Sequence, residues 1–173
     1  MVLPRSPRDV RTTRPPQPLL GALLVAAAAA AASGCAGQRI PNTDVDDTAE
    51  NREVVRFLED YRRAVETRDV GALLQMASRD YYDDNGTPIG GDDVDFDRLR
   101  EKLQLWRERV GDVRYEIRYR RVLFRQNRVY VDVRYSGSFQ VESHGDDQWS
   151  RRLSDNRLVL RREEDGYRIL SGM

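Results

Sequence analysis

The sequence has a single cysteine, Cys35, and a single histidine, His144. One thiol cannot form a disulfide within the chain, and one cysteine with one histidine is too small a set to hold a zinc ion. The sequence also lacks a P-loop and a Gly-x-Ser-x-Gly nucleophile elbow. These absences exclude a disulfide framework, a Cys/His zinc site, P-loop phosphate chemistry and an elbow-type hydrolase.

A charge excess of either sign is missing as well. The chain has 29 basic and 29 acidic residues. Residues 1–34, which are assigned below to a signal peptide, hold four arginines and one acid, so the remainder has 25 basic and 28 acidic residues and a net charge of about −3. A nucleic-acid-binding domain usually carries a basic excess. We therefore expect no nucleic-acid partner.

The first part of the sequence has the composition of a secretory signal peptide. Residues 1–18 carry four arginines against one acid, and residues 19–32 form a 14-residue apolar run that ends in small residues. A basic segment, a short apolar core and a small-residue junction are the three parts of such a peptide. The apolar run is too short for an ordinary transmembrane helix, which needs about 20 apolar residues.

The junction Ala32-Ser33-Gly34-Cys35 resembles the lipobox of bacterial lipoproteins, in which Leu, a small residue and Gly or Ala precede a cysteine. Ala32 departs from this pattern, because Leu is commoner there. The resemblance implies that the Cys35 thiol carries a diacylglycerol and that cleavage makes Cys35 the first mature residue. It also implies membrane attachment through this lipid and, because Ala36 rather than Asp follows the cysteine, a location in the outer membrane facing the periplasm.

Two alternatives stay open: an ordinary Ala-x-Ala cleavage with an incidental cysteine, and an uncleaved anchor. A lone thiol favours the lipoprotein, because a secreted chain with one cysteine has no partner for it. We assign residues 1–34 to the signal peptide, 35–48 to an acylated N-terminus and flexible tether, and 49–173 to one folded domain. The tether is expected because residues 36–48 have few large apolar groups to bury.

Three helices are predicted at the start of the domain. Apolar residues recur at helical spacing over about 49–67, and Asp69 occupies the N-cap position of a second helix over about 70–79. A third helix is expected over about 96–110, with Trp106 on its apolar face. Between the second and third helices, Asn85-Gly86 predicts a tight hairpin turn, because both residues tolerate a positive φ.

The hydrophobic period then changes to two, which predicts strands. Strands are expected over about 112–125, 129–141, 149–160 and 167–171. A change of phase predicts a bulge near Arg120–Arg121, Gly137 predicts a bend, and polar residues predict an interruption near Ser154–Asn156. Helices followed by a curved, mainly antiparallel sheet make an α+β domain.

This order of elements, which closes in Asp165-Gly166-Tyr167-Arg168-Ile169, resembles the nuclear-transport-factor-2-like (SnoaL-like) superfamily over residues 49–173. The resemblance implies a cone-shaped, cystatin-like half-barrel in which the sheet curls around a cavity that three helices close. It also implies a homodimer, because members often pair through the open face of the sheet. Members include enzymes such as ketosteroid isomerase and scytalone dehydratase as well as non-catalytic binding domains, so fold does not determine function here.

The polar residues in the inward phase of the strands are mostly tyrosines, and no acid or histidine shares that phase. Glu116 and Asp132 are in the outward phase, and His144 is in a polar loop. We therefore predict no catalytic residue. We expect the cavity to be lined by Trp106, Tyr115, Tyr119, Tyr135, Phe139 and Trp149. The first hypothesis is an envelope lipoprotein whose domain binds a small apolar ligand or an envelope protein, and the alternative is a small isomerase or dehydratase.

The aspartates of segments 83–86 and 92–97 raise the question of calcium. Placing Gly86 at the sixth position of an EF-hand loop puts Tyr81 at the first, where an acid is required. This excludes an EF-hand, while an irregular calcium site and simple helix capping remain alternatives; we predict no metal and no cofactor. The arginines expected on the outward face are Arg114, Arg118, Arg120, Arg134, Arg151, Arg152, Arg157, Arg161 and Arg162. We expect them to pair across strands with Glu116, Asp132, Glu142 and Asp155 rather than to bind an anionic lipid or partner.

Overall fold

The computed structural model of the chain describes residues 37–86, 91–143 and 146–173. For residues 142–143 and 146–147 it describes the backbone only. The chain divides into two units, Met1–Ala36 and Gly37–Met173, of which only the second is described. Cys35, His144 and the signal peptide predicted over residues 1–34 therefore lie outside the described residues. Within those residues, no helix has the length and apolar character needed to cross a membrane.

Three helices precede the main sheet. They are α2 (Ala49–Glu66), α3 (Val70–Met76) and α4 (Phe96–Arg109). Each begins after a residue whose side chain accepts a hydrogen bond from the backbone amide three positions later: Thr48, Asp69 and Asp95. Such caps satisfy amides that have no partner within the helix, which explains why the helices begin where the sequence predicts.

A short hairpin lies between α3 and α4, as predicted, but its turn is different. Strand β1 (Tyr82–Asp83) pairs antiparallel with β2 (Val94–Asp95). Asn85 and Gly86 have positive φ values of 50° and 67°, yet they begin a longer connection rather than form a two-residue turn. The Asn85 side chain donates to the carbonyl of Asp92 at 2.6 Å, so this residue helps to close the loop.

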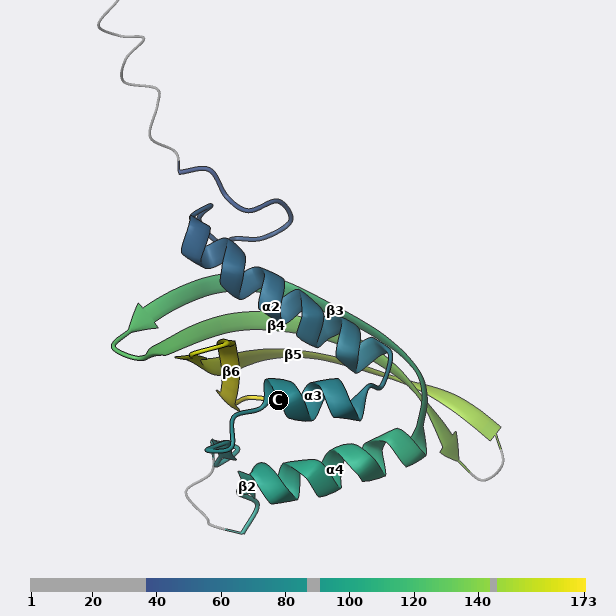
Figure 1. Cartoon of the computed structure of the whole chain (residues 1–173). Helices are drawn as coiled ribbons and strands as arrows, with labels where there is room; N and C mark the ends of the chain where they lie inside the picture. Colours follow the sequence, from purple (N-terminus) through teal and green to yellow (C-terminus); the bar gives the residue numbers. More distant parts are fainter. Residues whose placement is uncertain (1–36, 87–90, 144–145) are drawn as a thin grey trace, which may run out of the picture. The chain divides into compact units, whose positions relative to one another are not determined.

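The second half of the chain forms a four-stranded antiparallel sheet. Its strands are β3 (Val110–Arg125), β4 (Arg128–Ser143), β5 (Asp146–Glu163) and β6 (Gly166–Ser171), in the order β3-β4-β5-β6. The long strands curve, and the helices lie on one side of them (Figure 1). This is the α+β architecture that the sequence predicts.

The two irregularities predicted for β3 and β5 have different outcomes. The register between β3 and β4 shifts between Tyr119 and Arg121, which confirms the predicted bulge. β5 pairs with β4 without a break, so the interruption predicted near Ser154–Asn156 is wrong. Trp149 and Leu158 are nine positions apart, so they lie on opposite faces of a regular strand. The predicted interruption would have placed both of them on the core side. In the continuous strand Leu158 is 1% exposed, whereas Trp149 lies on the opposite face and is 50% exposed.

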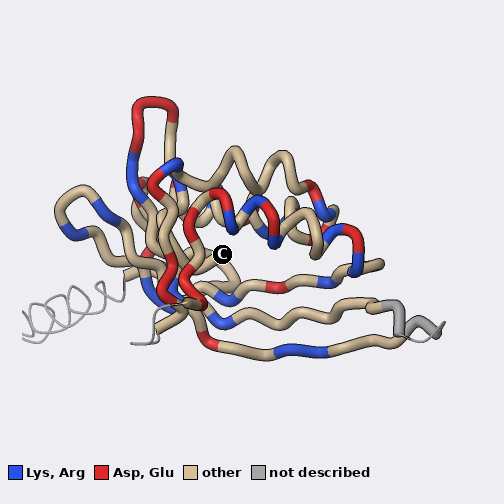
Figure 2. The backbone as a smooth tube through the Cα atoms, turned by 90° about the horizontal axis from the view of Figure 1, so that it is seen from below, with Lys and Arg blue, Asp and Glu red and all other residues tan. Residues whose placement is uncertain are grey.

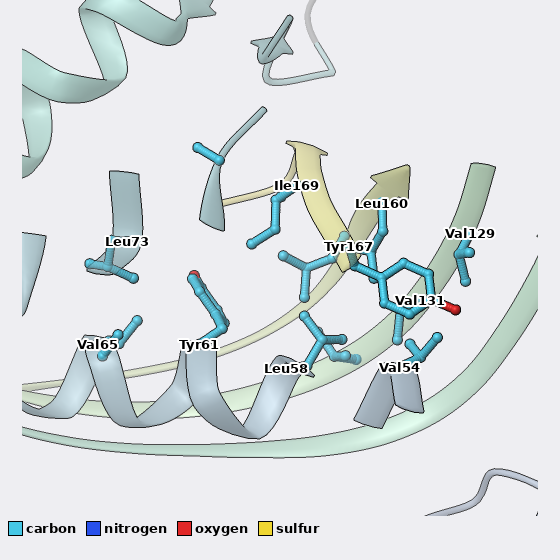
Figure 3. Close-up of a cluster of buried hydrophobic side chains, with 14 of the residues drawn as sticks. Val54, Leu58, Tyr61, Val65, Leu73, Val129, Val131, Leu160, Tyr167 and Ile169 are labelled. Carbon is cyan, nitrogen blue, oxygen red and sulfur yellow. The ribbon is translucent and has the colours of Figure 1, made fainter. Parts of the chain in front are cut away.

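The hydrophobic core lies between α2 and the sheet. In Figure 3, Leu58 of α2 points toward Val131, Leu160 and Ile169, which come from β4, β5 and β6. All four side chains are fully buried. Burying a side chain of this size contributes about 1.5–3 kcal/mol, so this face of α2 is a principal source of stability.

Residues 37–48 are part of the folded domain, and the flexible tether predicted there is wrong. Val45 is 3% exposed within the core, and the amide of Asp44 donates to the carbonyl of Tyr119 at 2.9 Å. Arg39 and Asp46 form an antiparallel β-bridge. One apolar side chain and several backbone hydrogen bonds are enough to order this polar segment. The domain therefore begins near residue 37, not at 49.

The outward face of the sheet carries paired charges. Asp132 accepts from Arg121 at 2.8 Å and from Arg157 at 2.6 Å, and Asp155 accepts from Arg134 at 2.7 Å. These hydrogen bonds hold the pKa of Asp132 below its usual value. They confirm the cross-strand pairing predicted for Asp132 and Asp155. The pairing predicted for Glu116 is wrong, because Glu116 forms no ion pair with a described residue, and the Glu142 side chain lies outside the described part of the structure. Basic and acidic residues are interspersed along the backbone (Figure 2).

Val45 provides a test of whether residues 37–48 belong to the fold. We expect Val45→Ala to lower the free energy of unfolding by about 1–3 kcal/mol, because it removes buried methyl groups and leaves a cavity. Gln38→Ala, in the same segment but exposed, should change it by less than about 0.5 kcal/mol. Urea denaturation followed by tryptophan fluorescence measures both, and equal small effects would show that the segment is not part of the cooperative unit.

Gly137 provides a test of why β4 needs a glycine. A β-carbon built there would lie 2.5 Å from the ring of Phe139, and the strand shows no register shift at this position. The close ring is sufficient to explain the glycine, and the bend predicted at Gly137 stays a prediction. Gly137→Ala should cost about 1–3 kcal/mol, as overpacking does, and most of this cost should vanish in a Phe139→Leu background. The same cost in both backgrounds, measured by urea denaturation, would contradict the ring explanation.

Candidate functional site

A cavity of about 450 Å³ lies between the helices and the sheet. Small-molecule sites in proteins commonly have this size. The helices contribute Tyr61, Val65, Leu73, Leu103 and Trp106; β3 and β4 contribute Val110, Tyr115, Tyr135, Phe139 and Val141; β5 and the residues after β6 contribute Ser150, Arg152, Asn156, Gly172 and Met173. All three helices and four strands or strand ends therefore meet at one site.

Four of the six predicted lining residues border this cavity: Trp106, Tyr115, Tyr135 and Phe139. The prediction is wrong for the other two. Tyr119 is buried, but its hydroxyl donates to Glu59 of α2 at 2.9 Å, away from the cavity. Trp149 is on the outward face of β5, with the Arg114 guanidinium 5.1 Å from the centre of its ring. The unbroken course of β5 explains this position.

Three tyrosines form a row along one wall. The rings of Tyr61 and Tyr115 meet edge to face with centroids 6.5 Å apart, and Tyr115 and Tyr135 are 5.5 Å apart. Burial raises the pKa of the Tyr61 and Tyr115 hydroxyls. Both groups are thus protonated at neutral pH, where they can donate hydrogen bonds but cannot act as bases. Sequence reasoning missed Tyr61, although it lies on the apolar stripe that predicted α2.

The acids closest to this wall serve the structure. Glu66 of α2 accepts from the backbone amide of Tyr115 at 3.1 Å and from Arg62 at 2.6 Å. Glu59 accepts from Arg62 at 2.8 Å as well as from Tyr119. Neither glutamate borders the cavity, and the described residues that do include no Asp, Glu or His. Within the described part of the chain, no group of His, Cys, Asp and Glu could hold a metal ion.

The cavity also has a polar side, which the sequence did not predict. Ser150, Arg152 and Asn156 alternate along the inward face of β5. The prediction that Arg152 lies on the outward face is wrong, because in the unbroken strand it shares the inward face with Leu158. The cavity is therefore lined not only by aromatic and aliphatic groups, as expected, but also by one cation and two neutral polar groups.

Residues 172–173 close one end of the cavity. The Asn156 side chain donates to the carbonyl of Gly172 at 2.8 Å, and the Gly172 amide donates to the carboxylate of Asp83 at 2.7 Å. The Met173 amide donates to the Tyr81 hydroxyl at 3.2 Å. These bonds connect β5 to the segment at β1 and hold Met173 against the cavity.

Comparison with solved structures shows which fold this is. No protein-family model and no curated protein match the sequence. A ketosteroid isomerase-like protein from Erwinia carotovora atroseptica matches with a TM-score of 0.57 and 20% identity, covering 72% of this chain and 93% of that chain.

Two further matches come from proteins assigned as dehydratases. One, of the nuclear-transport-factor-2-like family from Streptomyces avermitilis, matches with a TM-score of 0.56 and 14% identity over 70% of this chain and 92% of that chain. The other, assigned as a scytalone dehydratase from Novosphingobium aromaticivorans, matches with a TM-score of 0.62 and 10% identity over 71% of this chain and 80% of that chain. Identities this low show the fold alone. The domain has the cone-shaped α+β fold of nuclear-transport-factor-2-like proteins.

Proposed function

We propose that this protein is a lipid-anchored protein of the cell envelope whose domain binds a small, largely apolar molecule without converting it. The observation that carries the binding proposal is the cavity of about 450 Å³, lined mainly by aromatic and aliphatic side chains. Pockets of this kind bind ligands chiefly by removing apolar surface from water, with a few polar groups that orient the ligand.

The chemistry of the lining supports binding over catalysis. Isomerases and dehydratases move protons, and they need a group that accepts a proton at neutral pH. Among the described lining residues there is no Asp, Glu or His, and burial raises the pKa of the Tyr61 and Tyr115 hydroxyls, which keeps them protonated. The two glutamates nearby are bound to Arg62 outside the cavity.

The membrane proposal rests on the sequence of residues 1–35. The lipobox-like junction before Cys35 supports acylation of its thiol, and Ala36 supports sorting to the outer membrane, with the domain facing the periplasm. An envelope protein and a second copy of this chain are further partners that this proposal allows. Cys35 lies two positions before Gly37, where the described domain begins.

A second candidate function is a small cavity enzyme of isomerase or dehydratase type. The names of the solved structures favour it, since one is a ketosteroid isomerase-like protein and two are assigned as dehydratases. A molecule that copurifies with the domain can separate the two functions. Its recovery unchanged after prolonged incubation supports binding, and its conversion to a product supports the enzyme.

Filling the cavity tests the binding function. We expect the domain to bind N-phenyl-1-naphthylamine, a neutral apolar fluorophore, and Leu103→Trp to weaken that binding at least tenfold by occupying part of the cavity. Leu105→Trp is the matched control, because Leu105 is on the same helix but is 47% exposed and outside the cavity. Fluorescence titration measures all three proteins. No binding by the wild type, or equal weakening by both variants, would count against a ligand site here.

Removing the thiol tests the anchor. We expect wild-type protein expressed in a diderm bacterium to fractionate with membranes and Cys35→Ser to be released, with the same urea midpoint for both. Each buried acyl methylene contributes about 0.8 kcal/mol, so two or more chains hold a protein firmly. Intact mass should show diacylglycerol on the wild type only. Equal partitioning, or a mature wild-type protein without diacylglycerol, would instead support the ordinary cleavage or the uncleaved anchor.

A further inference from the structure

The cavity is divided into an apolar side and a polar side. Side chains from the helices and from β3 and β4 are aromatic or aliphatic, whereas β5 presents Ser150, Arg152 and Asn156. A purely apolar ligand would leave the polar side unused. A molecule with an apolar body and one polar end would match both sides.

Arg152 is the one charged side chain among the described residues that line the cavity. It forms no ion pair or hydrogen bond with any described residue. Arg134 and Arg157, on the outward face of the same sheet, each bind a carboxylate at 2.6–2.7 Å. The inward arginine thus lacks the acid that its outward neighbours have.

Arg152 is accessible to a ligand and lies next to an aromatic wall of the cavity. Its cross-strand neighbour on β4 is Gly137, and the Phe139 ring covers this glycine. On the other side, β6 pairs only with Val159–Glu163, so near Arg152 the strand β5 has β4 as its only described neighbour. Arg152 is exposed, and it also borders a second hollow that shares Tyr135, Asn156, Gly172 and Met173 with the cavity. Three acids line this hollow, and each already accepts a hydrogen bond: Asp83 from the Gly172 amide, Asp84 from the Gly86 amide and Asp155 from Arg134. A ligand can therefore reach Arg152 from solvent.

We propose that the molecule bound in the cavity is an amphipathic carboxylate, whose charged end pairs with Arg152 and whose apolar body lies against Trp106, Phe139 and the tyrosine row. This inference rests on the proposed binding function. The planar guanidinium offers two parallel N–H donors that match the two oxygens of a carboxylate. At the edge of an apolar cavity, such a pair is less screened than it would be on an open surface.

The neighbouring groups also favour an anion. Tyr135 and Ser150 flank Arg152 in the lining and carry hydroxyls that can donate a hydrogen bond to a carboxylate oxygen. A cationic ligand would meet the positive charge of Arg152 and find no acidic side chain among the described lining residues of the cavity. The arrangement therefore selects by charge as well as by hydrophobicity.

Pairs of ligands that differ only in charge test the inference. Decanoate is compared with decanamide, and 2-naphthoate with 2-naphthamide, by displacement of N-phenyl-1-naphthylamine. We expect wild-type protein to bind each carboxylate at least tenfold more tightly than its amide, because a hydrogen-bonded ion pair is lost with the charge. This preference should fall as salt is added.

The matched variants are Arg152→Gln and Arg151→Gln. Both remove one positive charge from an exposed residue of β5, but Arg151 faces the outward side next to Trp149. Arg152→Gln should abolish the preference for carboxylates and keep the affinity for the amides, while Arg151→Gln should keep the preference. Circular dichroism confirms that both variants are folded.

The outcomes separate this inference from the proposed function. If wild-type protein binds neither the fluorophore nor any of the four ligands, the binding function itself is wrong. If it binds each carboxylate and amide equally, the cavity is a binding site but Arg152 does not select anions. If both variants lose the preference equally, the effect comes from the overall charge of the protein and the direct pairing with Arg152 is overturned.

Discussion

The structure depends on how α2 is held to the sheet. Its apolar face packs against β4, β5 and β6 through residues such as Leu58. Its polar side covers the free edge of β3, where Glu66 accepts from the amide of Tyr115 and Arg62 donates to the carbonyl of the same residue at 3.4 Å. An uncovered edge strand exposes backbone groups that invite pairing with other chains. The helix thus both completes the core and covers the β3 edge at Tyr115, while Asp44 covers the same edge at Tyr119.

Both α2 and β5 contribute residues to the core and to the cavity. The first half of α2 carries Val54 and Leu58 into the core, and its second half carries Tyr61 and Val65 to the cavity. On β5, Leu158 and Leu160 are in the core, whereas Ser150 and Arg152 border the cavity. Tyr61 and Val65 are nevertheless buried in the same hydrophobic cluster as Leu58, so this wall of the cavity is also part of the core.

Sequence patterns were sufficient for the helices, the bulge at Arg120–Arg121 and the α+β class, because caps and hydrophobic periods are local. They failed where a distant contact decides. Trp149 is large and apolar, yet an unbroken register with β4 turns it outward and brings Arg152 inward. Residues 37–48 look like a linker by composition, but Val45 and the hydrogen bond from Asp44 to Tyr119 order them. Gly137 is explained by the ring of Phe139, which no spacing rule could show.

The order of residues 37–48 limits how far the domain could lie from the lipid proposed at Cys35. Each residue of extended chain spans at most about 3.6 Å, so the two steps from Cys35 to Gly37 reach only about 7 Å. If Cys35 is acylated, the domain is held at the membrane surface and not on a long tether as composition suggested. Amphipathic carboxylates partition into that same surface because their apolar bodies leave water while their charged ends remain hydrated. With that anchor, the domain would meet such ligands where they are concentrated, and Arg152, which has no partner among the described residues, would offer their charged ends a place to bind at the edge of the cavity.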